Sequence, residues 1–480
     1  MIDAMGDRSA ARSGGRLATS SRAGAAVRLE PLPELADVRP IDAAEALRDL
    51  PGLALLETAR PGRRARWTYL TADPVAVLEQ PAAGSDPFAE ARSLVRRVDG
   101  RALPADAPPF LGGLVGYLGY DLGHALERLP TIATDDQQLP LLRLALHDWA
   151  VVWDRRTGTA WIGGRALDGD AERLDRRLTR VVERLLAPVP GSGWAGPSET
   201  LEFTSSLDRG AYEAGVEAVR AFIARGDIYQ ANLTRRLETP FDGDPWPLYR
   251  RLRTGDPSLY AAYLDLGRGR ALMSASPEPF LTLDASGRVT TDPIKGTRPR
   301  GRTREQDRAL ACELLASEKD RAENVMIVDV LRNDLGRVCA PGTVRVPRLC
   351  RLERTAAVQH LVSTVTGQLD EGRDAFDLLA ASFPGGSITG APKIRAMELL
   401  EELEPVRRGP YTGSLGWIGP DGAMATSILI RTFVADGVRL SLHVGGGITY
   451  RSEPAAEWDE TVAKARGPLS AIGGHEVAAG

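Results

Sequence analysis

The fold is best predicted from residues 271–297, ALMSASPEPFLTLDASGRVTTDPIKGT. Two apolar runs, 271–276 and 280–283, lead through the turn formers of 284–287 into a third run at 288–291, a pattern that predicts consecutive strands. Lys295 follows just beyond the end of the last predicted strand, in the segment Pro293-Ile294-Lys295-Gly296. The pattern therefore predicts consecutive strands with a lysine in the loop that follows them.

Hairpins and helices alternate on both sides of this stretch. The spacing of apolar residues and turn formers predicts these elements: a hairpin from 142–153 and 159–163, a helix at 171–186, helical structure over 305–335 with a break near Ser317, a hairpin from 423–434 and 438–444 that ends in Gly445-Gly446-Gly447, and a last helix from Pro454. In the second helical segment, Val325, Ile327, Val328 and Leu331 are expected to face the core. The fold class is α+β.

The chain is too long for one ordinary core, and its composition changes at two places. Residues 1–30 are rich in Arg, Ser, Ala and Gly, and we expect a disordered N-terminal extension there. Residues 187–206 begin as a run of turn formers without periodicity and are expected to be a linker. The predicted organisation is an N-terminal domain over 31–186 and a larger C-terminal domain over 207–475.

Composition excludes several classes of protein. The 480 residues carry a net charge of −4 with both signs interspersed, so we expect no nucleic-acid partner. No apolar run is long enough for a membrane span. Three cysteines without a CxxC pair favour a reduced, cytoplasmic protein without structural zinc.

Lys295 is the most informative residue, because the chain has only four lysines among 60 lysine and arginine residues. A lysine amine can lose its proton and act as a nucleophile or base, whereas an arginine remains protonated. The alternative is an ordinary lysine on a surface loop.

Glu278 follows Ser276 and Pro277 at a sharp strand exit within an apolar stretch. Removal from water would keep this carboxyl protonated, so that it could serve as a general acid. A neutral Lys295 and a protonated Glu278 in one pocket would form an acid–nucleophile pair.

Three further acids are candidate metal ligands. Glu457, Glu460 and Lys464 share one face of the last predicted helix, directly after the glycine triplet. Glu323 precedes an apolar helical stretch. Carboxylates in such positions suit Mg²⁺, which takes oxygen ligands. The alternatives are a solvated Glu/Lys stripe and an acid that stabilises a helix N-terminus.

Residues 383–393, FPGGSITGAPK, form a glycine-rich loop ahead of a helix. Free amides at a helix N-terminus bind anions, but no Gly-Lys-Ser/Thr follows, so a carboxylate ligand fits as well as a phosphate. His360 and Arg431 are polar residues inside apolar runs. Taken alone, His360 is explained as a buried histidine and Arg431 as an arginine on an edge strand.

Together these segments resemble the chorismate-utilising family, which includes the large subunit of anthranilate synthase, component I of aminodeoxychorismate synthase, and the isochorismate and salicylate synthases. The resemblance covers about 53–473. It is strongest in GDIYQANLT (226–234), SPE (276–278), PIKGTRPRG (293–301), 320–338, 385–393 and 445–464. It implies an anthranilate synthase component I-like layered β-sandwich flanked by helices, with the N-terminal domain associated with the chorismate-binding domain.

Two positions separate the reactions of this family. Members that add water to chorismate are similar but have a lysine base where this chain has Gln230, and anthranilate synthases have alanine at the position of Lys295. The resemblance is therefore greatest to the aminodeoxychorismate synthases, which form 4-amino-4-deoxychorismate on the route to p-aminobenzoate and folate. An anthranilate synthase large subunit is the alternative enzyme, and a chorismate- or tryptophan-binding regulatory subunit is the non-enzyme alternative.

The resemblance also implies roles for individual residues. Lys295 would attack chorismate covalently and Glu278 would protonate the leaving hydroxyl, while Glu323, Glu457 and Glu460 would hold Mg²⁺. The substrate-binding residues would be Gln230, Thr297, His360, Arg431, Gly445, Gly446, Gly447 and Lys464.

The implied partners follow from the same resemblance. Ammonia would come from a separate glutamine amidotransferase subunit, because no cysteine in this chain lies in a Gly-x-Cys-x-Gly elbow. The segment LLET (55–58) resembles one that binds tryptophan in anthranilate synthases, which leaves tryptophan binding by the N-terminal domain open.

Overall fold

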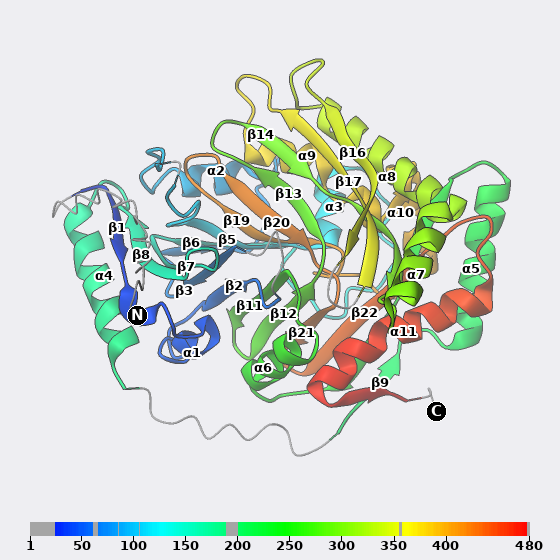
Figure 1. Cartoon of the computed structure of the whole chain (residues 1–480), viewed down its shortest axis with the longest axis horizontal. Coiled ribbons are helices and arrows are strands. Elements are labelled where there is room, and N and C mark those ends of the chain that lie inside the picture. The colour runs from blue at the N-terminus through cyan, green and yellow to red at the C-terminus, as the bar shows by residue number, and fades with distance from the viewer. Residues whose placement is uncertain are drawn as a thin grey trace, which may run out of the picture.

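The computed structural model describes residues 25–60, 66–84, 86–104, 106–188, 200–354 and 358–477. Two large β-sheets pack face to face, and helices cover their outer sides (Figure 1). The predicted layered sandwich flanked by helices is therefore confirmed.

The first sheet has 13 strands within the described residues, and it runs through both halves of the chain. Neighbouring strands in this sheet are antiparallel, except that β9 and β23 run parallel to each other. Its spatial order is β1 (Val27–Pro31), β8 (Thr159–Arg165), β7 (Trp149–Asp154), β3 (Trp67–Thr71), β2 (Ala54–Glu57), β11 (Tyr260–Gly267), β12 (Arg270–Ser276), β21 (Thr432–Asp436), β22 (Arg439–Ile448), β10 (Gln230–Pro240), β9 (Leu201–Ser205) and β23 (Gly474–Glu476), with β18 (Gly390–Ala391) paired to β10.

The second sheet has ten strands within the same residues and is antiparallel throughout. Its spatial order is β15 (Ile294–Pro299), β17 (Val358–Gln368), β14 (Arg288–Thr291), β13 (Pro279–Leu283), β20 (Met424–Ile428), β19 (Ser414–Ile418), β5 (Gly113–Leu118), β6 (Leu142–His147) and β4 (Ala76–Leu78), with β16 (Arg345–Arg354) paired to β17.

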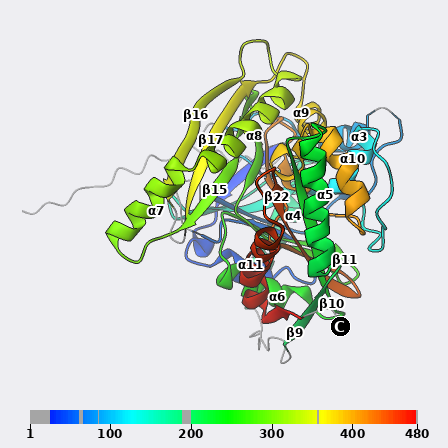
Figure 2. The same cartoon turned by 90° about the vertical axis from the view of Figure 1, so that its right-hand side faces the viewer.

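Helices flank both sheets, and Figure 2 shows α5, α10 and α11 together on one side of the molecule. They are α1 (Pro40–Glu45), α2 (Ala89–Val95), α3 (Gly123–Leu126), α4 (Ala171–Leu186), α5 (Arg209–Ala224), α6 (Pro245–Gly255), α7 (Arg304–Ala316), α8 (Glu318–Gly336), α9 (Ala375–Ser382), α10 (Lys393–Leu403) and α11 (Pro454–Ile472), with short 3₁₀ turns η1 (Pro33–Leu35), η2 (Tyr120–Leu122) and η3 (Gly386–Ile388). No helix of the described segments is both long and apolar enough to cross a membrane.

The chain passes from one sheet to the other at two neighbouring places. β12 ends at Ser276 in the first sheet and β13 begins at Pro279 in the second, while β20 and β21 make the reverse passage. The two passages are hydrogen-bonded to each other, since the Ile428 amide donates to the Glu278 carbonyl and the Ala275 amide donates to the Arg431 carbonyl. Residues 271–297 thus form the predicted strands, but β12 belongs to the first sheet and the strands after it belong to the second.

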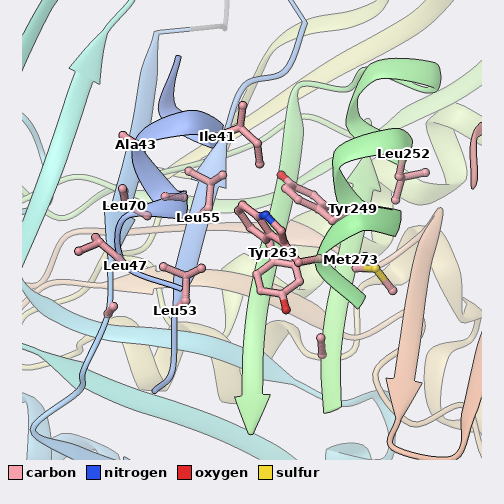
Figure 3. Packing of buried hydrophobic residues seen from close by; sticks show 14 of the residues in the cluster. Ile41, Ala43, Leu47, Leu53, Leu55, Leu70, Tyr249, Leu252, Tyr263 and Met273 are labelled. Carbon is pink, nitrogen blue, oxygen red and sulfur yellow. The ribbon is translucent and has the colours of Figure 1, made fainter. Parts of the chain in front are cut away.

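Several hydrophobic cores hold these layers together. Tyr69, Phe110 and Trp417 meet between the two sheets, with ring centroids 5.2–6.0 Å apart. A second core lies between the first sheet and its helices, where Tyr249 of α6 packs against Tyr263 of β11 (Figure 3). Burying one such aromatic side chain contributes about 1.5–3 kcal/mol, so these contacts strongly favour one alignment of the sheets.

The predicted domain boundaries need correction. Strand β1 begins inside the expected extension, and β9 occupies 201–205 inside the expected linker. Residues 1–24 and 189–199 of these two segments lie outside the described residues. The N-terminal region contributes β1, β2, β3, β7 and β8 to the first sheet and β4, β5 and β6 to the second. These strands continue the C-terminal strands directly, because β2 pairs with β11 and β5 pairs with β19.

The predicted helices agree well with the structure. α4 covers 171–186, and Ser317 separates α7 from α8 while its hydroxyl accepts a hydrogen bond from the Asp320 amide. One expectation for α8 was wrong. Val325 does not face the core, because it lies on the outer side of the helix and is 39% exposed.

Two predicted strands were also too long. The run 142–153 is divided at Asp148 into β6 and β7, which belong to different sheets. The run 423–434 is divided in the same way between β20 and β21, so Arg431 lies in the passage between the sheets and not on an edge strand, with a positive φ of 50°. An apolar run indicates that its residues are buried, but it does not indicate to which of the two sheets they belong.

Candidate active site

Lys295 lies inside β15, not beyond a strand end as expected. Its strand is interrupted directly after it, where Gly296 adopts a φ of 73° and the pairing with β17 shifts register. Glycine is needed there, since a Cβ would lie 2.9 Å from the Cβ of Asp320. The bulge leaves the Lys295 amine free to donate a 3.0 Å hydrogen bond to the main-chain carbonyl of Ser387.

The surroundings of this amine disfavour its charged form. Burial lowers the pKa of Lys295 below its usual 10.5, and the charge of Lys464 acts in the same direction. Glu278, Glu323 and Glu460 oppose the shift but do not cancel it. The structure thus gives the lysine more of the neutral character that nucleophilic attack requires.

Glu278 occupies the first passage between the sheets and is buried. Burial raises the pKa of its carboxyl, although the charges of Lys295 and Lys464 and a hydrogen bond from Ser387 act against this. Removal from water therefore favours the neutral forms of both Lys295 and Glu278.

Glu457, Glu460 and Lys464 share one face of α11, as predicted. Lys464 forms a 2.7 Å ion pair with Glu460 and donates a 2.8 Å hydrogen bond to the Gly445 carbonyl. Burial acts to raise the pKa of Glu460, but the charge and hydrogen bond of Lys464 act more strongly in the opposite direction. The pKa of Glu460 therefore lies below its usual value. Burial raises the pKa of Glu457, which accepts a 2.6 Å hydrogen bond from Ser452.

The glycine triplet lies inside β22, close to its end. Side chains do not fit at these positions. A Cβ on Gly445 would lie 2.5 Å from the Leu233 carbonyl oxygen, and one on Gly447 would lie 2.4 Å from Nε2 of Gln230. A Cβ on Gly446 would lie 3.0 Å from Oε2 of Glu457. The triplet therefore makes room for neighbouring polar side chains.

Glu323 reaches the same region from α8. Its Oε1 is buried without a hydrogen-bond partner, and the nearest cation is Lys319, with Nζ 3.9 Å away. Burial raises the pKa of Glu323, while Lys295 and Lys319 act against the shift. A buried acceptor without a donor is costly unless a ligand satisfies it.

The carboxylates predicted to bind a metal come from α8 and α11. In the described part of the chain, no three His, Cys, Asp or Glu side chains form a ready metal cluster. The charge of Glu460 on α11 nevertheless raises the pKa of Glu323 on α8, so the two carboxyls lie near each other. Mg²⁺ needs only one or two protein carboxylates because water and substrate oxygens complete its shell, so this donor set fits Mg²⁺.

Thr297, His360 and Arg431 form a neighbouring polar group. The Thr297 hydroxyl lies 2.9 Å from Nδ1 of His360 across the β15–β17 pair. Burial lowers the pKa of His360 to about 4, helped by the charges of Arg431 and Arg60. Arg431 also lies 3.6 Å from Asp256. His360 is accordingly a neutral group beside a cationic one.

Gln230 completes the predicted set at the start of β10. Its side chain is buried, with Oε1 lacking a partner, and its Nε2 lies beside Gly447. The amide is thus positioned among the polar groups of the site with one acceptor still unused.

Sequence reasoning missed Ser387 and Lys319. Ser387 holds both Lys295 and Glu278, but its position depends on how the loop 385–389 folds back, which no local pattern shows. Lys319 was detectable, because it is one of only four lysines. The fourth, Lys393, pairs with Asp334 at 2.8 Å in an adjacent groove.

Comparison with known proteins adds to this geometry. The family model described as chorismate binding enzyme matches residues 55–470. Anthranilate synthase component 1 of Streptomyces coelicolor is 44% identical over 444 residues, 90% of this chain and 85% of the relative. Aminodeoxychorismate synthase component 1 of Salmonella typhimurium is 43% identical over 360 residues, 74% of this chain and 76% of the relative. The crystal structure of anthranilate synthase component I from Streptococcus pneumoniae aligns with a TM-score of 0.77 and 31% identity, covering 85% of this chain and 93% of that chain.

Proposed function

The chain belongs to the chorismate binding enzyme family, and we propose that within this family it converts chorismate and ammonia to 4-amino-4-deoxychorismate. The observation that carries this proposal is the half-buried Lys295, whose amine has a lowered pKa and donates to the Ser387 carbonyl, together with the buried acid Glu278, whose charge acts on that amine. Relatives of similar identity carry the names of both aminating activities, so the choice between them depends on these residues.

The proposed reaction proceeds by two allylic displacements. The neutral amine of Lys295 forms a bond to C2 of chorismate, the double bond shifts, and the C4–O bond breaks as Glu278 protonates the departing hydroxyl, which leaves as water. Ammonia then bonds to C4, the double bond shifts back, and the C2–N bond to Lys295 breaks. Protons lost from the two nitrogens balance those taken up by the hydroxyl and the lysine.

Other residues bind and orient the substrate in this proposal. Lys464, Thr297, His360 and Arg431 supply polar and cationic groups for the carboxylates and hydroxyl of chorismate, and the glycine triplet permits close approach. Gln230 provides an amide, which cannot deprotonate water, and this favours amination over water addition.

Mg²⁺ is the proposed cofactor. Glu323 and Glu460 would hold it with Glu457 nearby, and the unpartnered oxygen of Glu323 supports this assignment. When bound, the ion would neutralise the ring carboxylate of chorismate.

A glutamine amidotransferase subunit is the proposed source of ammonia, and the "component 1" in the names of relatives supports a second component. The three cysteines are all free, which supports a cytoplasmic location.

Tryptophan is a candidate ligand elsewhere in the molecule. A cavity of about 670 Å³ is lined by Leu56, Glu57 and Thr58 of the segment that resembles a tryptophan site. Its apolar lining fits an aromatic side chain, and Glu57 is already bound by Arg253 at 2.6 Å. Equilibrium dialysis with tryptophan tests this assignment.

Incubation with chorismate, Mg²⁺ and ammonium tests the function directly. We expect p-aminobenzoate only after an aminodeoxychorismate lyase is added. Anthranilate fluorescence without the lyase would instead establish the second candidate, an anthranilate synthase large subunit, which the longer match to the Streptomyces coelicolor relative favours. Binding of chorismate and metal by calorimetry without any turnover would indicate a regulatory subunit.

A further inference from the structure

Arg408 is a buried arginine that no step of the proposed reaction uses. Its side chain is 1% exposed and forms a two-point ion pair with the buried Glu404, at 2.7 and 2.8 Å. The other hydrogen bonds go to the Ile388 carbonyl at 3.1 Å, the Asn232 carbonyl at 2.6 Å and the Thr412 hydroxyl at 3.3 Å. A guanidinium group has five N–H donors, and these five bonds use them all. Arg408 therefore acts through the segments that it holds and not by binding a ligand.

The Ile388 carbonyl connects Arg408 to the loop of the candidate site. Ile388 directly follows Ser387 in the turn η3, and the Ser387 carbonyl accepts the 3.0 Å hydrogen bond from Lys295. Ser387 also forms a hydrogen bond with the side chain of Glu278. The carbonyls of Ser387 and Ile388 belong to adjacent planar peptide groups, so an anchor on one restricts the other.

The Asn232 carbonyl connects Arg408 to strand β10. The amide of the same Asn232 donates a 2.8 Å hydrogen bond to the Thr389 carbonyl in the loop after η3. Glu404 is anchored to this strand as well, because its Oε1 accepts a 3.0 Å hydrogen bond from the Thr234 amide. The buried ion pair thus joins β10 to the loop that contains Ser387.

The N-terminal region supports Arg408 from another direction. The guanidinium carbon lies 4.4 Å from the centre of the Tyr120 ring, a contact that is favourable between a cation and an aromatic face removed from water. The Tyr120 amide donates a 2.7 Å hydrogen bond to the Gly409 carbonyl, and the Asp121 carboxyl accepts one of 2.8 Å from the Gly409 amide. These contacts fix the main chain next to Arg408 and leave its side chain little freedom.

We propose that Arg408 is a positioning residue of the candidate active site. It sets how the loop containing Ser387 lies against β10, and it thereby places the Ser387 carbonyl that holds the Lys295 amine. A planar guanidinium suits this role, because its rigid fork reaches a carboxylate and two carbonyls at the same time. The inference rests on the proposed function, since that function assigns the nucleophile to Lys295. A misplacement of reacting groups by about 1 Å can lower a rate about 100-fold.

The variant Arg408→Lys tests this role, and Arg165→Lys is its matched control. The side chain of Arg165 is also 1% exposed, pairs with the acid Asp421 at 2.8 Å, and donates to two main-chain carbonyls, those of Asp99 and Arg101. None of these partners belongs to a segment that carries a predicted residue of the active site. Both variants keep a buried positive charge beside its carboxylate but lose the planar fork.

The informative measurement is the rate at which the Lys295 adduct forms, followed by intact mass after mixing with chorismate. We expect Arg408→Lys to slow adduct formation and kcat with ammonium about tenfold or more, although all the protein finally reacts. The dissociation constant of chorismate, measured by calorimetry, should stay within about threefold of the parental value. Arg165→Lys should react at the parental rate. Loss of folded protein alone would lower the fraction that reacts and leave the rate constant unchanged.

A second pair of variants covers the case in which Arg408→Lys does not fold. Arg408→Met combined with Glu404→Leu removes both charges, and so leaves no unpaired charge in the interior. Arg165→Met combined with Asp421→Leu is its control. We expect the same slow adduct formation in the first double variant and the parental rate in the second.

A parental rate constant for adduct formation in a folded Arg408 variant would overturn the proposal. Equal slowing in the Arg165 controls would also overturn it, because any buried ion pair would then have the same effect. If the parent makes anthranilate or forms no adduct, the proposed function fails. Crystal structures of Arg408→Lys and the parent then decide the positioning role. We expect the Ser387 carbonyl to move by about 1 Å or more, and an unmoved carbonyl would contradict the role.

Discussion

Lys295 donates its hydrogen bond to the main-chain carbonyl of Ser387, and not to a carboxylate. A carbonyl accepts from a neutral amine as well as from an ammonium group, so this contact positions the nitrogen without requiring its charge. The arrangement differs from that of Lys393 and Lys464, each of which is paired with an acid.

Lys295→Ala tests the covalent role. We expect turnover with ammonium to fall by a factor on the order of 10³ or more, since the nucleophile is removed. Intact-mass measurement after mixing with chorismate should show an adduct on the parent and none on the variant. Lys295→Arg should be equally inactive, because a guanidinium group stays protonated. A Lys295→Ala protein that forms 4-amino-4-deoxychorismate at the parental rate would refute the role.

Glu278→Gln tests the general acid through pH dependence. Burial lowers the pKa of Lys295 and raises that of Glu278, so the rate should rise with pH as the lysine deprotonates and fall as the glutamate ionises. The variant should lose about 10²- to 10⁴-fold in kcat. Its profile should also lack the alkaline limb. An alkaline limb that persists in Glu278→Gln would assign that ionisation to another group.

Glu323→Gln and Glu460→Gln test the metal site. Each should weaken Mg²⁺ binding measured by calorimetry by about tenfold or more, because one oxygen ligand loses its charge. Glu453→Gln is the control, since Glu453 is exposed just ahead of α11 and outside the candidate site. Equal Mg²⁺ affinity in all three variants and the parent would remove both acids from the site.

His360→Gln tests a half-buried neutral histidine through stability. The native pKa of about 4 lies below the unfolded value of 6.5, so the unfolded chain binds the proton first as pH falls. The free energy of unfolding of the parent should therefore decrease between pH 6.5 and 4 by up to about 3 kcal/mol more than that of the variant. Denaturant titrations at several pH values measure this difference. Parallel curves for the two proteins would indicate that folding does not lower the pKa of His360.

Local signals in the sequence predicted α4, α7, α8 and α11 accurately, whereas others, among them α5 and α6, were not predicted. The break at Ser317 was visible because serine is a favoured N-cap, and the start of α11 was visible because proline is favoured in a first turn. The acids of α11 and α8 could be placed on their helices from spacing alone, and the resemblance then connected them to Lys295.

Long-range pairing could not be predicted in the same way. The runs 142–153 and 423–434 each cross between layers, and apolar character is the same on both sides of the crossing. The register that sets Asn232 opposite Gly447, next to Gln230, depends on the whole length of β10 and β22. The place of Ser387 beneath Lys295 and Glu278 depends on three segments far apart in the chain.

The two linked passages between the sheets have an evolutionary consequence. Glu278 and Arg431 belong to both layers at once, so any sliding of one layer over the other would move them relative to Lys295. Insertions at distant hairpin tips leave that alignment untouched, whereas volume changes among Tyr69, Phe110 and Trp417 would alter it. Substitutions of residues that do not contact a ligand should therefore be tolerated at the hairpin tips. They should be selected against between the two sheets.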